Sequence, residues 1–252
     1  MNATERALVL KIGRFREADV WVRLLTPNRG VFNAFAFGGS RSRRRFVGCL
    51  DPLSHVLFTL GSSRRGDYTV LEEGSLLNNF SEIRKDSVRT GIAVNCMRFV
   101  EAVEVNPDDA GIAYDLLLET LTMLDESQAN PEFVPWLFRA KYAFESGFTP
   151  DFMACGACGK PVGMESGYKF GIERGMIACP TCLSAGKPLD GLARPISTGA
   201  LRALDWIQQS TPSDWATIVM DSEVRRQCSQ LVELFVAYHL GLSWDNGMYK
   251  KV

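Results

Sequence analysis

A chain of 252 residues, 46% of them hydrophobic and 23% charged, has the composition of a soluble globular protein with room for two or three compact units. The formal net charge of −1 favours no particular partner, and the first residues lack the basic and then apolar pattern of a secretory signal. The longest apolar stretch, residues 231–242, is interrupted by Glu233 and His239 and is too short to span a bilayer. We therefore expect a cytoplasmic protein that is not bound to a membrane.

The charge is unevenly distributed along the chain. Residues 1–80 contain 12 Lys and Arg against 7 Asp and Glu, whereas the remainder is net acidic. This asymmetry makes the N-terminal part the expected binder of a polyanion.

Residues 4–80 contain five short apolar runs separated by turn residues, a pattern typical of β-strands. The runs are residues 7–10, 20–25, 31–37, 53–60 and 68–77, and residues 27–30 predict a hairpin turn. Five short strands in this length fit a closed barrel better than a sandwich, because closure removes exposed edges in a small domain. We predict an OB-type barrel over residues 1–80.

Three predicted loops of this barrel carry basic residues. They are Arg41, Arg43, Arg44 and Arg45 in the loop at residues 38–46; Arg64 and Arg65 in a second loop; and Lys11, Arg14 and Arg16 in a third. Guanidinium groups pair bidentately with phosphate, and the glycines and serines of the first loop let a backbone approach closely. Phe15 and Phe46 lie among these charges, where they could stack on bases. Solvated loops without a ligand are the alternative, but three basic loops in one barrel favour nucleic acid.

From residue 81 the apolar period becomes helical. Apolar faces over residues 88–103, 112–124 and 131–144 predict three helices, the last opened by Pro131. Further along, Ser197 or Thr198 is expected to cap a fourth helix, and residues 224–242 predict a fifth. Helices thus precede and follow residues 150–190. We predict one helical domain over residues 81–252, with residues 150–190 inserted into it.

That insertion contains two C-x2-C pairs, Cys155 with Cys158 and Cys179 with Cys182. Each pair lets one tight turn aim two thiolates at a single ion, and two such turns form the closed four-sulfur site that Zn²⁺ favours. Residues 168–172 and 176–178 predict a hairpin between the pairs. Because four cysteines leave no open coordination position, we expect one structural zinc ion.

Two disulfides, or unrelated buried thiols, are the alternatives to a metal site. The lack of a secretory signal and the presence of three further cysteines, Cys49, Cys96 and Cys228, disfavour them.

The sequence contains no motif typical of an enzyme. Residues 156–160 are too short for a phosphate-binding Walker loop and no serine follows the lysine, and there is no G-x-S-x-G motif. His55 and His239 lie in a predicted strand and a predicted helix without paired carboxylates. We predict a protein without enzymatic activity. One functional hypothesis is a zinc-ribbon and OB interaction module of transcription or translation that binds RNA or protein partners.

Short segments along essentially the whole chain match one known family in order. The segments are residues 17–19, 24–30, 37–41 and 45–53 in the predicted barrel, then residues 138–139, Gly147, the four cysteines and residues 196–201. Together they resemble the RecO family of DNA repair proteins.

The resemblance implies an α+β protein that mediates DNA repair and homologous recombination. RecO proteins bind single- and double-stranded DNA through an OB barrel, anneal complementary strands, and act with RecR to place RecA on strands coated by single-strand binding protein (SSB). They also bind the acidic, hydrophobic-ended SSB tail on the helical domain. A cytoplasmic protein of this kind is expected at the nucleoid.

The resemblance also implies roles for individual residues. Arg41, Arg43, Arg44 and Arg45 occupy the basic loop of the family and are the expected phosphate contacts. Arg139 matches a basic position that we associate with SSB-tail docking; an exposed helical arginine without this role is the alternative. RecO proteins are usually basic over more of the chain, so the acidic residues 81–252 shift the expected DNA contacts to the barrel.

Overall fold

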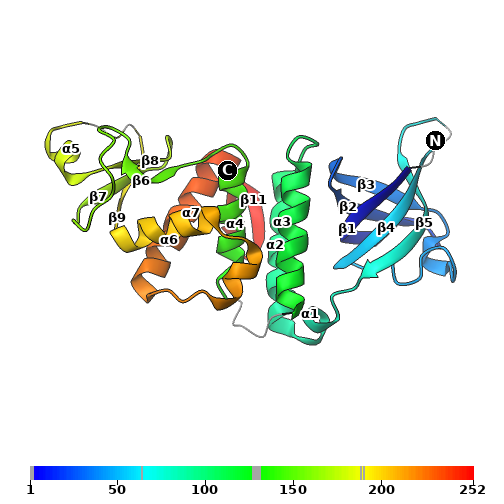
Figure 1. Cartoon of the computed structure of the whole chain (residues 1–252). Helices are drawn as coiled ribbons and strands as arrows, with labels where there is room; N and C mark the ends of the chain where they lie inside the picture. Colours follow the sequence, from blue (N-terminus) through cyan, green and yellow to red (C-terminus); the bar gives the residue numbers. More distant parts are fainter. Residues whose placement is uncertain (1–2, 64, 127–131, 188, 190) are drawn as a thin grey trace. The chain divides into compact units, whose positions relative to one another are not determined.

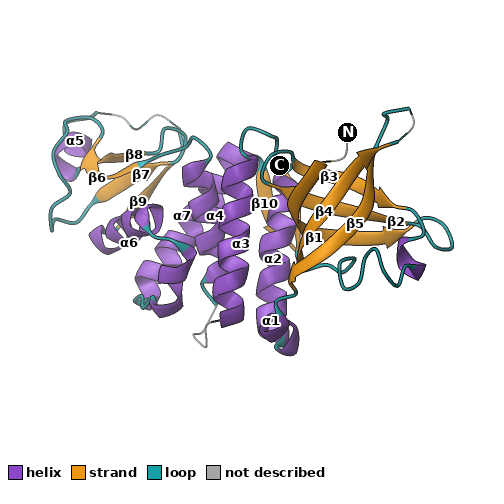
Figure 2. Ribbon diagram, turned by 45° about the vertical axis from the view of Figure 1, so that its right-hand side comes forward, coloured by secondary structure: helices purple, strands orange, loops and turns teal. Residues whose placement is uncertain are grey.

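The computed structural model describes residues 3–63, 65–126, 132–187, 189 and 191–252. The chain divides into two compact units, Met1–Pro131 and Glu132–Val252, and both contain helices and strands (Figures 1 and 2). In the part of the chain covered by these ranges, no helix is both long and apolar enough to cross a membrane.

The first unit begins with a closed five-stranded barrel. Its strands are β1 (Ala3–Arg14), β2 (Val20–Thr26), β3 (Gly30–Ala36), β4 (Ser54–Ser62) and β5 (Thr69–Asn78), in the order β1-β2-β3-β5-β4. β1 pairs with β4 to close the barrel, and β3 runs parallel to β5. Alternation along β2 directs Val20, Val22 and Leu24 into the core, whereas Trp21 is half-buried on the other face. The five predicted N-terminal strands are confirmed.

The hairpin turn between β2 and β3 touches the connection between two helices. Gly30 has φ +66°, and a side chain there would overlap the carbonyl oxygen of Val105. The Val31 N–H donates to the same oxygen at 3.0 Å. Glycine is required at position 30, because it tolerates positive φ and leaves room for this close approach.

Three helices complete the first unit: α1 (Ser81–Lys85), α2 (Ser87–Val103) and α3 (Ala110–Glu126). The Asp86 carboxylate caps α2 by accepting from the Val88 N–H at 2.8 Å. Arg84 in α1 donates to the carbonyl oxygens of Pro52 and Leu53, each at 2.7 Å. These helices pack with the barrel in the first compact unit, which ends at Pro131. The domain boundary that the sequence predicted at residue 80, between barrel and helical domain, stays a prediction.

The second unit combines helices with a small four-stranded sheet. Helices α4 (Val134–Glu145), α6 (Thr198–Gln209) and α7 (Ser222–Leu240) pack on one another, and α5 (Pro180–Ser184) is short. The sheet has the order β6-β8-β7-β9, formed by β6 (Asp151–Cys155), β7 (Tyr168–Gly171), β8 (Met176–Ala178) and β9 (Ala193–Ile196). Phe152 of the sheet lies 5.3 Å from Phe144 of α4, and Phe144 lies 5.7 Å from Phe235 of α7, measured between ring centroids. Aromatic packing therefore joins sheet and helices.

The ends of some helices differ from the prediction. The last helix was expected to reach residue 242, but it ends at Leu240 because Gly241 adopts φ +62°. A hairpin of β10 (Leu242–Asp245) and β11 (Met248–Lys251) follows. Pro131, the predicted start of the third helix, lies outside the described residues, and α4 begins at Val134. The Ser197 cap is confirmed, since its hydroxyl accepts from the Ala200 N–H at 3.2 Å.

Candidate nucleic-acid interface and metal centre

The basic loop after β3 is folded against the barrel. It starts with a 3-10 turn, Gly39–Arg41. The Gly38 N–H donates to the Asp19 carboxylate at 2.8 Å, and the Ser40 N–H donates to the Ala18 carbonyl at 3.1 Å. Further on, the Arg45 carbonyl accepts from the Gly74 N–H at 2.8 Å. These contacts join the loop to the β1–β2 connection at one end and to β5 at the other.

Arg14 and Arg43 line one groove on the barrel, with a volume of about 790 Å³. Several small residues share its lining, including Gly13, Gly39, Ser40, Ser42 and Gly48. Arg43 and Arg44 are exposed and, within the described ranges, have neither a hydrogen bond nor an ion pair. Their guanidinium groups are therefore available to an external anion, and the small residues give a phosphate backbone access.

Other predicted contacts already have partners within the barrel. Arg41 forms a close ion pair with Glu17, Arg16 lies 3.9 Å from Asp19, and the Arg45 guanidinium donates to the Phe37 carbonyl at 2.6 Å. Exposed ion pairs of this kind contribute at most about 1 kcal/mol, so a phosphate can displace the carboxylate. Lys11 and Arg65 are exposed. Lys11 and Arg14 do not lie in the predicted loop, because strand β1 continues to Arg14. Arg64 lies outside the described residues.

Phe46 does not lie where the sequence predicted. It is only 4% exposed and packs in the barrel core with Cys49, so it cannot stack on a base. The loop turns back on itself here, with the Cys49 N–H donating to the Phe46 carbonyl at 3.1 Å. The Arg45 guanidinium lies 5.0 Å from the centre of the Phe46 ring.

Sequence reasoning also missed three aromatic residues near Phe15. Phe35 and Phe37 contact Phe15, with the ring centroids of Phe15 and Phe35 5.4 Å apart, and Tyr68 contacts Phe35 and Phe37 in turn. The alternation of β3, with Ala34 and Ala36 in the core, was the available signal that Phe35 points outward.

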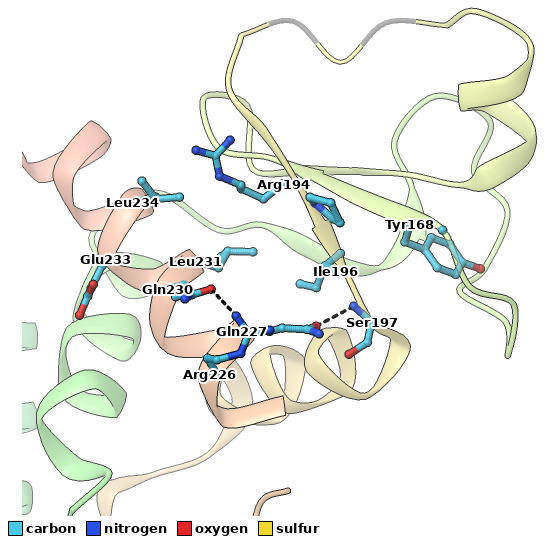
Figure 3. A pocket seen from close by; sticks show the side chains of 12 residues that line it. Tyr168, Arg194, Ile196, Ser197, Arg226, Gln227, Gln230, Leu231, Glu233 and Leu234 are labelled. Atoms are coloured by element: carbon cyan, nitrogen blue, oxygen red, sulfur yellow. Dashed lines mark hydrogen bonds between the residues drawn. The ribbon is translucent and has the colours of Figure 1, made fainter. Parts of the chain in front are cut away.

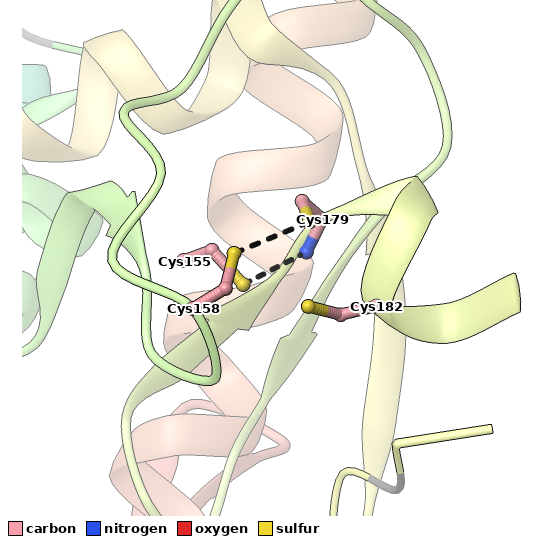
Figure 4. Close-up of side chains that lie close together, drawn as sticks. All are labelled: Cys155, Cys158, Cys179 and Cys182. Carbon is pink, nitrogen blue, oxygen red and sulfur yellow. Dashed lines mark hydrogen bonds between the residues drawn. The ribbon is translucent and has the colours of Figure 1, made fainter. Parts of the chain in front are cut away.

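The four predicted cysteine ligands come together in the second unit (Figure 4). Their Sγ atoms all lie within 4.8 Å of one another. Cys155 ends β6, and Cys179 directly precedes the short helix α5, which contains Cys182. After Cys158, Gly159 has φ +71° and its N–H donates to the Cys155 carbonyl at 2.7 Å, which closes the first tight turn.

The spacing of the sulfur atoms fits a tetrahedral ion. A Zn–S bond of about 2.3 Å requires neighbouring sulfur atoms about 3.8 Å apart, and the Sγ atoms of Cys158 and Cys179 are 3.9 Å apart. All seven cysteines of the chain are free, so the disulfide alternative is wrong.

Backbone N–H groups also favour the thiolate form of Cys155. Burial raises the pKa of Cys155, but the N–H groups of Cys179, Ala157 and Cys158 outweigh burial and lower the pKa to about 6. A hydrogen bond shared with Cys158, together with burial, raises the pKa of Cys182 to about 12. Four thiols at this spacing cannot all ionise unless a cation balances them, and a bound divalent ion supplies that charge.

Comparison with known proteins places the chain in a family. The family model described as "Recombination protein O N terminal" matches residues 1–80, and that described as "Recombination protein O C terminal" matches residues 84–246. The chain belongs to the RecO family. It is 43% identical over 252 residues to the DNA repair protein RecO of Maridesulfovibrio salexigens and 44% identical over 252 residues to that of Oleidesulfovibrio alaskensis. It is 42% identical over 255 residues to that of Nitratidesulfovibrio vulgaris (strain DP4); each match covers 100% of both chains.

Arg139 of this RecO-family chain is not an exposed helical arginine. It is 7% exposed, its guanidinium donates to the Tyr249 hydroxyl at 3.0 Å, and it lies 4.0 Å from the Glu233 carboxylate. The alternative proposed from the sequence is therefore wrong. Arg139 holds Glu233 and the C-terminal hairpin in place.

Glu233 lines a second groove, between β9 and α7, with a volume of about 790 Å³ (Figure 3). Ile196, Leu231 and Leu234 give it an apolar lining, and Arg194 adds positive charge, whereas Arg226 is ion-paired with Glu223 at 2.6 Å. The groove is held together by a hydrogen bond from the Ser197 N–H to the Gln227 side chain at 2.9 Å. An apolar cavity bordered by arginines is suited to a peptide that combines apolar and acidic side chains.

Proposed function

We propose that this protein is a DNA repair and recombination mediator that binds single- and double-stranded DNA through its barrel and anneals complementary strands. The observation that carries the proposal is the groove lined by Arg14 and Arg43, next to Arg44, which has no partner among the described residues. The names of the relatives support a role in DNA repair. The strand order β1-β2-β3-β5-β4 supports assignment of the barrel to the OB type.

Annealing by this surface would depend on neutralising charge. Two complementary strands repel each other through their phosphates, and guanidinium groups that bind phosphate reduce that repulsion. Because the contacts go to the backbone, the pairing edges of the bases remain available to the second strand. No bond is made or broken, so the proposed activity is not enzymatic.

We propose that Cys155, Cys158, Cys179 and Cys182 hold one structural Zn²⁺ ion. Four sulfur ligands would leave no position for substrate or water, so the ion would stabilise the lobe formed by β6, β7, β8 and α5. The Sγ–Sγ spacing and the lowered pKa of Cys155 support this assignment.

The proposed mediator acts with protein partners at the nucleoid. We propose that RecR cooperates with it to load RecA on SSB-coated single strands. The groove between β9 and α7 is our candidate for the SSB tail, because Leu231 and Leu234 suit its hydrophobic end, and Arg194 suits its acidic residues. Arg139 would contribute indirectly, by holding Glu233.

The test is annealing of complementary oligonucleotides coated with SSB, with and without this protein, at low and moderate salt. We expect faster annealing that weakens as salt rises, because counterion release drives phosphate binding. Naked complementary strands serve as a second substrate. If annealing of neither naked nor coated strands is accelerated at low salt, the proposal is wrong.

A further inference from the structure

Four aromatic side chains form a continuous surface on the barrel, which we call the aromatic platform: Phe15, Phe35, Phe37 and Tyr68. The Phe35 ring centroid lies 5.4 Å from that of Phe15 and 5.2 Å from that of Tyr68. Phe37 lies 6.2 Å from Phe15 and 6.1 Å from Tyr68. The side chains come from three segments: Phe15 from the β1–β2 loop, Phe35 and Phe37 from the end of β3 and the residue after it, and Tyr68 from the β4–β5 loop.

The platform is not part of the barrel core. Ala34 and Ala36, on either side of Phe35, are fully buried, so Phe35 lies on the opposite face of β3. Phe15 is 40% exposed and Tyr68 is 42% exposed. Single exposed aromatic residues need no explanation, but a contiguous exposed cluster marks a binding surface.

A fifth ring supports the platform from beside it. Trp21 on β2 is paired in register with Phe35 on one side and with Gly13 on the other. A side chain at position 13 would overlap the Trp21 ring, so the indole lies over the glycine. The outer face of β1, β2 and β3 therefore continues the aromatic surface toward the groove that Gly13 lines.

Arginines lie beside the platform. The Arg16 guanidinium lies 5.8 Å from the centre of the Phe15 ring, and the Arg45 guanidinium donates to the carbonyl of Phe37. Arg65 belongs to the same loop as Tyr68, where the Ser63 N–H donates to the Tyr68 carbonyl at 3.0 Å. Rings that stack on bases, with arginines placed for the phosphates between those bases, form the usual surface for single-stranded nucleic acid. An apolar peptide would bring no negative charge to these arginines.

We infer that the aromatic platform stacks unpaired nucleobases and makes the barrel prefer single strands to duplex. This inference rests on the proposed DNA-binding function. The faces of the bases are hidden in a duplex and accessible in a single strand, so the platform adds affinity for single strands alone. The groove lined by Arg14 and Arg43 would contact the phosphates of single strands and of duplex alike. Stacking and charge are thus separate contributions from neighbouring parts of one barrel.

The experiment compares full-length Phe15→Ala and Tyr68→Ala with the unchanged chain, using a thymidine oligonucleotide, a duplex, and an abasic oligonucleotide that has the same phosphates without bases. Both substituted residues are partly exposed and lie outside the barrel core, so the fold is expected to tolerate the changes. We expect each variant to bind the single strand more weakly, by on the order of tenfold per lost base contact. Duplex affinity and the salt dependence should stay unchanged.

Matched controls separate stacking from other effects. Tyr68→Phe keeps the ring and should retain single-strand affinity, and Tyr238→Ala removes an exposed ring from α7, outside the platform, and should have no effect. The unchanged chain should bind the abasic strand more weakly than the thymidine strand.

The possible outcomes also distinguish this inference from the proposed function. Equal affinity of the unchanged chain for abasic and thymidine strands, with normal salt dependence, would overturn the stacking inference and leave DNA binding intact. Equal losses on single strand and duplex in the two alanine variants would also overturn it. Failure of the unchanged chain to bind any of the three nucleic acids at low salt would overturn the proposed function itself.

Discussion

The Nε2 atom of His55 lies 2.7 Å from the hydroxyl oxygen of Tyr114, so one buried hydrogen bond joins strand β4 to helix α3. His55 is 9% exposed and Tyr114 is 2% exposed. Burial raises the pKa of Tyr114 to about 12, which keeps its hydroxyl protonated at neutral pH. The barrel and the helices of the first unit therefore share a polar contact inside their common core.

Removing the Tyr114 hydroxyl should destabilise the first unit. Tyr114→Phe leaves the buried His55 nitrogen without its partner, and an unsatisfied buried group costs about 1–3 kcal/mol. Urea denaturation measures the loss. Tyr68→Phe removes an exposed hydroxyl from the same unit and should change the unfolding free energy by less than about 0.5 kcal/mol. Equal effects of the two substitutions would contradict the importance of this contact.

The same pair predicts a pH dependence. Burial, and secondarily the positive charge of Arg6, lowers the pKa of His55 below its usual value of 6.5. The folded state therefore binds a proton less readily than the unfolded state. The contribution of neutral His55 to the unfolding free energy is fully present above pH 6.5. It is lost as the pH falls from 6.5 toward the lower pKa of the folded state.

His55→Gln tests this dependence, because the glutamine amide can still form a hydrogen bond with the Tyr114 hydroxyl but has no titratable proton. Unfolding free energies measured on both sides of pH 6.5 should fall less steeply in the variant than in the unchanged chain. The same slope in both proteins would assign the pH dependence to other groups.

Phosphate contacts by the basic loop predict a change in salt dependence. The double substitution of Arg43 and Arg44 by alanine should weaken DNA binding and reduce the slope of log affinity against log salt, by about 0.9 per lost contact on duplex and about 0.7 on single strands. Arg202→Ala removes an exposed arginine of α6 and serves as the control. A slope that stays the same in the double variant would remove the loop from the DNA interface.

The four-cysteine site predicts one metal ion per chain. Cys158→Ser removes one ligand from the most exposed corner of the cluster, so metal content measured by mass spectrometry should fall and the second unit should unfold at a lower temperature. Cys228→Ser alters a buried cysteine outside the cluster and should keep the ion even if it reduces stability. Full metal content in Cys158→Ser would contradict the assignment.

Gly30→Ala should be costly. The substitution forces a side chain to positive φ and into the Val105 carbonyl, and each effect destabilises the fold. Gly66 also has positive φ, but a side chain there would meet nothing within 4 Å. Gly66→Ala therefore measures the conformational cost alone, and thermal unfolding should show a clearly larger loss for Gly30→Ala.

Local patterns predicted the features that depend on a few neighbouring residues. The cysteine spacing, the five N-terminal strands and the Ser197 cap are of this kind, because turn residues and the alternation of apolar and polar side chains depend on residues close together in the sequence. The C-terminal hairpin was also readable, because Asn246-Gly247 is a typical pair for a tight hairpin turn, and both residues adopt positive φ. The prediction stopped at the helix ending at residue 242 and assigned no strands after it.

Features that depend on distant parts of the chain were not predictable in this way. Phe46 stands next to four arginines in the sequence, yet the loop folds back and places its ring in the barrel. Arg139 has the sequence context of a surface helix, yet Tyr249 covers it from the other end of the unit. The aromatic platform likewise brings together loops that are far apart in sequence.

The contact between Gly30 and Val105 has a consequence for dividing this protein into pieces. The match to the N-terminal family description ends at residue 80, but a fragment cut there would lose the Val105 carbonyl and the Tyr114 hydroxyl, and would expose the barrel surface that α3 covers. The matched segment is thus shorter than the segment that packs as one compact unit. An autonomous DNA-binding fragment would have to continue through α3, to Glu126.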